Sequence, residues 1–182
     1  MLNIPNSLTL LRIAAIPGIV IALDYSHFGL AFALFIAAGV TDSLDGAIAR
    51  MMKTRTELGA YLDPLADKGL VLTLLISLAS LGKVPEWVVT IIVTRDVVCL
   101  GGYSLLFFLT GEQMEVRPSW TGKLATFLQI TGIGGALLLL WQPQLDLAVI
   151  DQILLQSAAI VTAFAGSEYV LRGLQWYQTR PD

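Results

Sequence analysis

Four aspartates lie between residues 42 and 67, in two closely spaced pairs. Asp42 and Asp45 are three residues apart, and Asp63 and Asp67 are four residues apart. Either spacing puts two side chains on the same face of an α-helix. Carboxylate oxygens with no histidine or cysteine nearby are ligands for Mg²⁺, Mn²⁺ or Ca²⁺ and not for zinc. We therefore expect a site for two divalent cations, which can clamp a phosphoryl group during an in-line displacement.

The simpler interpretation of an acidic residue at a helix end is a cap or a surface ion pair. Four carboxylates in this register favour the metal site, because each costs about 2.5–3.5 kcal/mol at the centre of a membrane helix unless cations compensate it. Arg50 and Lys68 would offset part of the charge. Gly46 and Ala49 share the face of the first pair, and Gly59 precedes the second. These small residues leave room for a ligand or for close helix packing.

The elements that must position the aspartates are apolar helices. Of the 182 residues, 55% are hydrophobic and 14% are charged, whereas a soluble domain has about 25% charged residues. Segments long enough, or nearly so, to cross a membrane lie near residues 8–24, 29–49, 65–82, 85–109, 122–141 and 148–171. Tryptophans fall at or near the ends of these segments. The sequence predicts an all-α integral membrane protein, a six-transmembrane-helix bundle in one domain, residues 1–182.

Basic residues predict the orientation. Of the 11 lysines and arginines, Lys83 alone falls on the side opposite the termini, and Arg95 falls within a span. The positive-inside rule then puts both termini and the aspartates at the cytoplasmic face, as expected for a multi-pass protein of a bacterial inner membrane. The net charge of -3 argues against a nucleic-acid partner. The single cysteine, Cys99, excludes an internal disulfide.

The stretch from Asp42 to Asp67 resembles the signature of the CDP-alcohol phosphatidyltransferase family, D-x2-D-G-x2-A-R-x8-G-x3-D-x3-D, and matches every specified position. The resemblance extends from Pro5 through at least Gln129. It implies an enzyme that moves a phosphatidyl group from CDP-diacylglycerol to an alcohol and releases CMP. Two ions of Mg²⁺ or Mn²⁺ and a homodimer are implied as well.

The same resemblance implies a role for each matching residue. Asp42, Asp45, Asp63 and Asp67 would hold the cations, and Asp67 would also remove the proton of the acceptor hydroxyl. The residues that would bind the CDP-lipid are Asn6, Thr9, Arg12, Gly46, Ala49, Arg50 and Gly59. Asn6 could equally cap a helix. A buried Arg12 needs an anionic partner, either a lipid phosphate or the aspartate cluster.

The second half of the sequence should select the acceptor. Arg95 and Asp96 are adjacent in a predicted span, where the alternative to a functional role is a structural salt bridge. Phosphatidylglycerophosphate synthases tend to have a further arginine where this chain has Tyr103. The Arg-Asp pair and an Arg-Pro-x4-Lys stretch look more like cardiolipin synthases of the eukaryotic type. We therefore expect phosphatidylglycerol as acceptor, with glycerol 3-phosphate as the alternative. The expected acceptor-binding residues are Arg95, Asp96, Arg117 and Lys123.

A cation transporter is the alternative from a different class, because intramembrane acids also mark ion pathways. Transport would favour acids near the membrane midplane on discontinuous helices. The aspartates of this chain instead fall at the predicted helix ends, on the basic side. This placement favours the enzyme.

Overall fold

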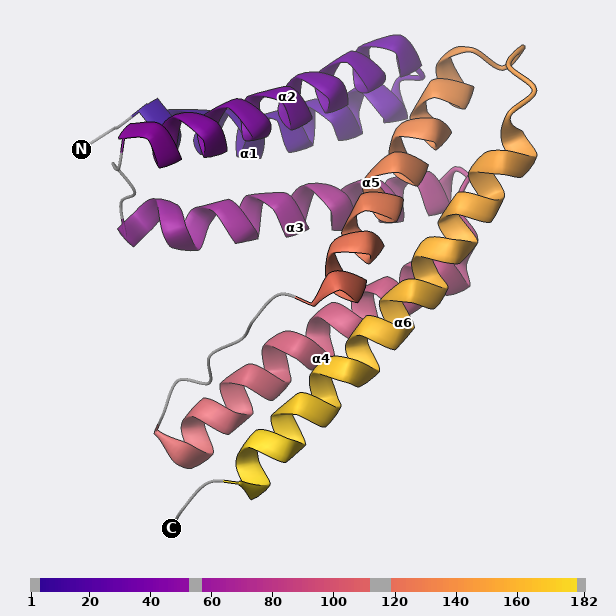
Figure 1. The fold of residues 1–182 in the computed structure, drawn as a ribbon. Helices are drawn as coiled ribbons and strands as arrows, with labels where there is room; N and C mark the ends of the chain where they lie inside the picture. Colours follow the sequence, from indigo (N-terminus) through magenta and orange to yellow (C-terminus); the bar gives the residue numbers. More distant parts are fainter. Residues whose placement is uncertain (1–3, 53–56, 112–118, 180–182) are drawn as a thin grey trace. The chain divides into compact units, whose positions relative to one another are not determined.

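The structure is a computed structural model that describes the backbone of residues 4–52, 57–111 and 119–179, with the side chains of residues 11–42, 66–106, 108–111 and 119–179. Six α-helices occupy these ranges (Figure 1). They are α1 (Ile4–Asp24), α2 (Phe28–Met52), α3 (Glu57–Ser80), α4 (Glu86–Thr110), α5 (Trp120–Trp141) and α6 (Ala148–Gln178). No strand occurs in the described ranges, so the predicted all-α class and the number of helices are confirmed.

Five of the six helices are longer than the sequence predicted, and the difference is largest for α3 and α6. α3 begins at Glu57 rather than near residue 65, and α6 ends at Gln178 rather than near residue 171. Hydropathy marks only the apolar part of a helix, whereas the backbone hydrogen bonds continue through polar residues of good helix propensity. As a consequence Asp63 lies inside α3 and not at its start.

The chain divides into two compact units. Unit 1 comprises Met1–Lys83 and Ile133–Val149, and unit 2 comprises Val84–Gly132 and Ile150–Asp182. In unit 1, α1 packs against both α2 and α3. Its fully buried apolar side chains include Ile19, Ala31, Leu74, Leu75, Leu78, Ile133 and Leu137. These residues form the core that holds α1 between its two neighbours.

A tight turn reverses the chain between α1 and α2. Ser26 adopts a left-handed conformation with φ 61°. The Ser26 amide donates to the Leu23 carbonyl (3.0 Å) and the His27 amide donates to the Ala22 carbonyl (2.7 Å). This is the Schellman pattern, which satisfies the last carbonyls of a helix. Because the connection is so short, α2 runs back along α1 (Figure 1).

In unit 2, α4 and α6 lie side by side (Figure 1), and glycines allow the close approach. A Cβ atom added at Gly173 of α6 would meet Leu106 of α4 at 3.4 Å, and one added at Gly102 would meet Tyr169 at 3.9 Å. Small residues at helix interfaces are common in membrane proteins, where backbones must pack closely. The first half of α5 joins this unit through a hydrogen bond described below.

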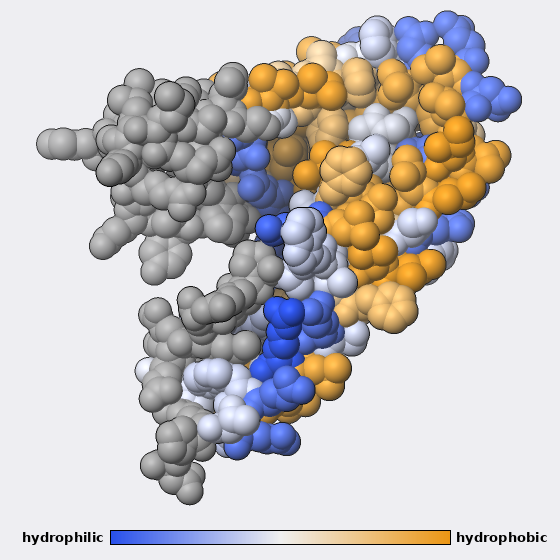
Figure 2. Space-filling model, viewed as in Figure 1, coloured by the Kyte–Doolittle hydropathy of each residue, from blue (hydrophilic) through white to orange (hydrophobic). Residues whose placement is uncertain are grey.

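The surface is apolar over large areas, as expected of a membrane protein (Figure 2). Phe108 is 83% exposed and Phe164 is 67% exposed, which water would disfavour. Within the described residues, three helices are long and apolar enough to cross a membrane, namely α4, α5 and α6. The described apolar part of α2, Phe28–Asp42, is shorter. Six spans and cytoplasmic termini therefore stay predictions.

Among the glycines of unit 1 whose surroundings the structure describes, Gly29 has the least room for a side chain. A Cβ atom there would lie 2.8 Å from Nε1 and 3.0 Å from Cδ1 of Trp141. The Trp141 ring stacks on Phe32 with centroids 5.8 Å apart, so it is held from a second side. We expect Gly29→Ala to destabilise the purified protein by about 1–3 kcal/mol, the usual cost of overpacking. Thermal unfolding in detergent measures this.

Gly39→Ala is the matched control, because it makes the same change in the same helix, and no described atom beyond its chain neighbours and its own helix backbone lies within 4 Å of the added Cβ. Its effect should be neutral or slightly stabilising, since alanine favours helix more than glycine by about 1 kcal/mol. Equal unfolding temperatures for the two variants would contradict the packing described at Trp141.

Candidate active site

Arg12 joins the two predicted aspartate pairs. Its side chain lies in α1 and is only 1% exposed. The Nη2 atom lies 2.6 Å from Oδ1 of Asp42 in α2, and the Nη1 atom lies 2.6 Å from Oδ1 of Asp67 in α3. One guanidinium thus connects three helices of unit 1. The predicted convergence is confirmed for one aspartate of each pair, and the anionic partner that a buried Arg12 requires is the aspartate cluster.

Helical spacing determines on which face of each helix the other two aspartates lie. Asp45 follows Asp42 by three residues in α2, and Asp63 precedes Asp67 by four residues in α3. Each therefore occupies the same helical face as its partner. Their side chains lie outside the described residues. The same holds for the side chains of Asn6, Thr9, Gly46, Ala49, Arg50 and Gly59, whose backbones lie in α1, α2 and α3, and for Arg117 as a whole.

Asp42 and Asp67 fit a divalent-cation site. Their side chains are about half exposed, 47% and 49%, and carboxylates from two helices converge on one positive charge. Hard oxygen ligands of this kind are those that Mg²⁺ and Mn²⁺ prefer. Among the described side chains, no three or more His, Cys, Asp or Glu residues gather as a metal site would require. Asp45 and Asp63 would complete the set.

A narrow groove lies beside Arg12, between α1 and α2. Its volume is about 240 Å³. The residues that line it are Leu11, Arg12, Ala14, Ala15, Leu34, Ala37, Ala38 and Thr41. The Thr41 hydroxyl donates to carbonyls of its own helix, so most of the lining is apolar. The groove is therefore an apolar surface beside the Arg12 side chain.

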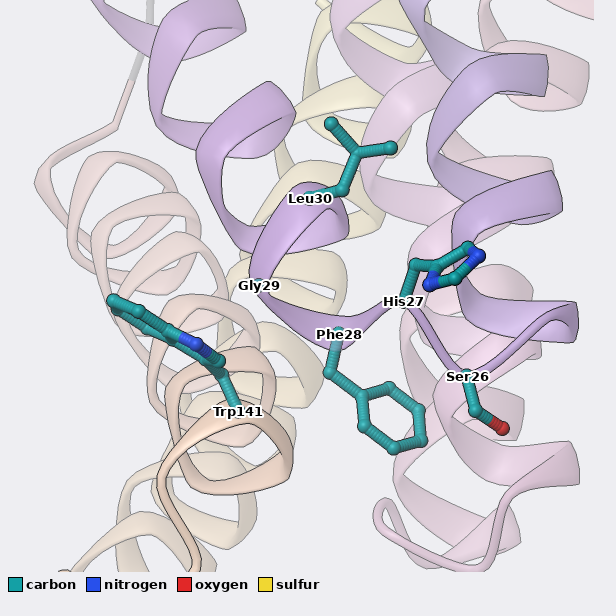
Figure 3. A pocket seen from close by; sticks show the side chains of 6 residues that line it. All are labelled: Ser26, His27, Phe28, Gly29, Leu30 and Trp141. Atoms are coloured by element: carbon teal, nitrogen blue, oxygen red, sulfur yellow. The ribbon is translucent and has the colours of Figure 1, made fainter.

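A second hollow, of about 550 Å³, lies at the α1–α2 turn (Figure 3). It is lined by Ser26, His27, Phe28, Gly29, Leu30 and Trp141. The Ser26 hydroxyl and the His27 ring lie on the opposite side of the turn from the Trp141 indole (Figure 3). Its polar groups do not converge, so we assign no site there.

The predicted acceptor residues lie in unit 2. Arg95 pairs with Asp96 at 2.7 Å, although adjacent side chains of a helix do not usually face each other. The Nε atom of Arg95 is buried and has no hydrogen-bond partner among the described residues. Lys123 instead lies over the ring of Trp120, 5.3 Å from its centroid. The structure thus shows the Arg95–Asp96 pair but does not bring Lys123 into contact with it.

Sequence reasoning missed a polar cluster near Arg95. Thr121 of α5 donates to Glu168 of α6 at 2.5 Å, and Arg172 donates to the same carboxylate. Ser119 lies within 2.9 Å of Thr121 and caps α5. The available signal was an acidic residue and an arginine four positions apart in an otherwise apolar helix.

Similar proteins point to the same chemistry as the aspartates. Residues 2–166 match the family described as CDP-alcohol phosphatidyltransferase. A probable phosphatidylglycerophosphate synthase of Mycobacterium tuberculosis (strain ATCC 25618 / H37Rv) is 37% identical over 179 residues, 95% of this chain and 82% of the relative. A CDP-diacylglycerol--glycerol-3-phosphate 3-phosphatidyltransferase of Haemophilus influenzae is 35% identical over 175 residues, 92% of this chain and 91% of the relative. The relative of the same name from Yersinia pestis (strain Pestoides F) is 33% identical over 176 residues, 93% of each.

Replacing Arg12 tests whether the double ion pair holds unit 1 together. Arg12→Met leaves two neighbouring carboxylates without their shared cation. Because the two carboxylates are about half exposed, the cost should be smaller than the about 3–5 kcal/mol of a fully buried pair, and thermal unfolding in detergent should occur at a lower temperature. MnCl₂ should then raise the unfolding temperature of the variant more than that of the wild type, since a bound cation takes over part of the neutralisation.

Lys83→Met is the control, because this exposed lysine follows α3 and should change stability by less than about 0.5 kcal/mol. If Arg12→Met unfolds at the same temperature as the wild type, the ion pairs of Arg12 do not stabilise unit 1.

Proposed function

We propose that this chain, which belongs to the CDP-alcohol phosphatidyltransferase family, transfers the phosphatidyl group of CDP-diacylglycerol to glycerol 3-phosphate and releases CMP. Membership makes it a transferase and decides against the cation transporter. The acceptor rests on one observation. Relatives that are 33–37% identical over at least 92% of this chain are named as phosphatidylglycerophosphate synthases or as glycerol-3-phosphate phosphatidyltransferases. They support the alternative acceptor over phosphatidylglycerol, which the sequence alone favoured.

The preference for phosphatidylglycerol rested on a missing positive charge near Arg95. That argument considered only neighbours in the sequence, where Tyr103 stands at the expected position. Unit 2 also has basic residues outside α4, among them Lys123 of α5. These residues would supply further positive charge for a dianionic phosphate, so Tyr103 does not argue against glycerol 3-phosphate.

For the donor, the aspartates of α2 and α3 would act as one group. Asp42, Asp45, Asp63 and Asp67 would hold two Mg²⁺ or Mn²⁺ ions, whose charge would offset that of the donor pyrophosphate. Arg12 would keep Asp42 and Asp67 in place through its two ion pairs. The groove that ends at Arg12 would take one acyl chain of the lipid.

For the transfer itself, Asp67 would be the base. Its carboxylate would take the proton of the acceptor hydroxyl. The acceptor oxygen would form a bond to the phosphorus that carries diacylglycerol, and the bond from that phosphorus to the CMP oxygen would break. No covalent enzyme intermediate is needed, because one in-line displacement exchanges CMP for the acceptor alcohol.

For the acceptor, we assign the phosphate to Arg95. Its Nε atom is a buried donor, and an unsatisfied buried donor costs about 1–3 kcal/mol. An acceptor phosphate would satisfy it, while the ion pair with Asp96 would orient the guanidinium. Arg117 and Lys123 would add positive charge near the start of α5. The distribution of basic residues further supports a cytoplasmic active site, and the family resemblance supports a homodimer.

The acceptor is tested by competition. Purified enzyme receives CDP-diacylglycerol with equal concentrations of glycerol 3-phosphate and phosphatidylglycerol, and mass spectrometry resolves the lipid products. We expect phosphatidylglycerophosphate in at least tenfold excess, because one additional charge-assisted phosphate contact contributes about 1.5–3 kcal/mol. Predominant cardiolipin would overturn the proposed acceptor and leave the donor chemistry intact.

The base is tested by Asp67→Asn. The amide cannot accept the proton, so kcat should fall by about 10²–10⁴-fold. CDP-diacylglycerol binding, measured separately, should be largely retained. Asp24→Asn makes the same change at the end of α1 and should leave kcat unaltered. If the Asp67 variant loses binding and turnover in equal measure, Asp67 is a metal ligand and another group is the base.

A further inference from the structure

We infer that Glu168 is a positioning residue of the acceptor site, which holds the first turn of α5 against α6 and thereby places the Arg95 guanidinium. This inference rests on the proposed function, because it takes Arg95 as the phosphate-binding residue. Glu168 lies outside the aspartate signature, and it takes no part in the ion pair between Arg95 and Asp96.

Both carboxylate oxygens of Glu168 are engaged. Oε2 accepts the hydrogen bond of Thr121 at 2.5 Å, and Oε1 accepts from Arg172 one turn further along α6. The side chain is 34% exposed, so the carboxylate is only partly solvated. Hydrogen bonds to an ionised acceptor are about twice as strong as neutral ones. Glu168 is therefore a firm connection between α5 and α6.

The connection continues into the cap of α5. The Gly122 amide donates to the Ser119 hydroxyl oxygen at 3.0 Å, and the Ser119 and Thr121 hydroxyl oxygens are 2.9 Å apart. Since the Thr121 hydrogen points to Glu168, Ser119 is the donor in that pair. The bonds form one directed chain from Gly122 through Ser119 and Thr121 to Glu168. Consecutive hydrogen bonds of this kind strengthen one another.

The Arg95 side chain lies between the two elements that this chain joins. A Cβ atom at Gly122 of α5 would be 3.7 Å from Nη2 of Arg95, and one at Gly166 of α6 would be 3.0 Å from its Cγ. Gly122 and Gly166 therefore form two walls of the space that Arg95 occupies. The distance between these walls depends on the link between Thr121 and Glu168. Glu168 acts on Arg95 through this packing.

The test compares variants of the purified full-length enzyme. Thr121→Val removes the hydroxyl with little change in volume, whereas Thr121→Ser retains it. For Thr121→Val and Glu168→Ala, we expect KM for glycerol 3-phosphate to rise about tenfold, with kcat and KM for CDP-diacylglycerol within about twofold of the wild type. Thr121→Ser should restore the wild-type KM. Ser167→Ala is the control, since the Ser167 hydroxyl donates to the Phe164 carbonyl of its own helix.

A merely structural role would give a different result. Thermal unfolding is measured for every variant, and a role in folding alone would lower the unfolding temperature without changing KM for the acceptor. That outcome, or an equal rise of KM for both substrates, would overturn the inference. If Glu168→Ala does not fold, the two Thr121 variants decide.

The wild type is assayed first, which separates this inference from the proposed function. A wild type that makes cardiolipin and no phosphatidylglycerophosphate refutes the proposed acceptor. KM of the variants is then measured for phosphatidylglycerol, whose phosphate Arg95 would bind instead. Normal wild-type activity with an unchanged acceptor KM in both Thr121→Val and Glu168→Ala refutes the role of Glu168 alone.

Discussion

A guanidinium that is removed from water must be paired, and unit 1 is organised around that requirement. Arg12 is almost fully buried in α1, so it needs anions from its neighbours. It finds one on α2 and one on α3, Asp42 and Asp67. The same two contacts therefore neutralise the arginine, bring like-charged aspartates together and connect three helices. Without this cation, mutual repulsion would oppose the convergence that a phosphoryl-transfer site needs.

In unit 2, polar side chains within apolar helices are paired by hydrogen bonds rather than by one central charge. Polar side chains on α5 and α6 satisfy each other within apolar helices, as in the contact of Gln129 with Thr162 at 2.8 Å. The same applies to Thr121 with Glu168. Arg95 differs, because its Nε atom is buried and has no hydrogen-bond partner among the described residues. The proposed function assigns the acceptor phosphate to this donor.

The residues proposed for the donor and those proposed for the acceptor lie in different units. In the proposed function, the aspartate signature and Arg12, which lie in unit 1, act on the CDP-linked donor. Arg95, Thr121 and Glu168, which lie in unit 2, are assigned to the acceptor.

The sequence by itself determined the all-α class, the six helices, and the pairing of Asp42 with Asp45 and of Asp63 with Asp67, because hydropathy and helical spacing are local properties. It also predicted that a buried Arg12 needs an anion. It favoured the acceptor that the relatives do not support, since it weighed only charges adjacent to Arg95 in the chain. Tertiary structure decided which anions Arg12 meets, that Lys123 lies over Trp120, and that Glu168 joins α6 to α5. These contacts join residues on different helices or depend on side-chain direction, and no local pattern in the sequence specifies either.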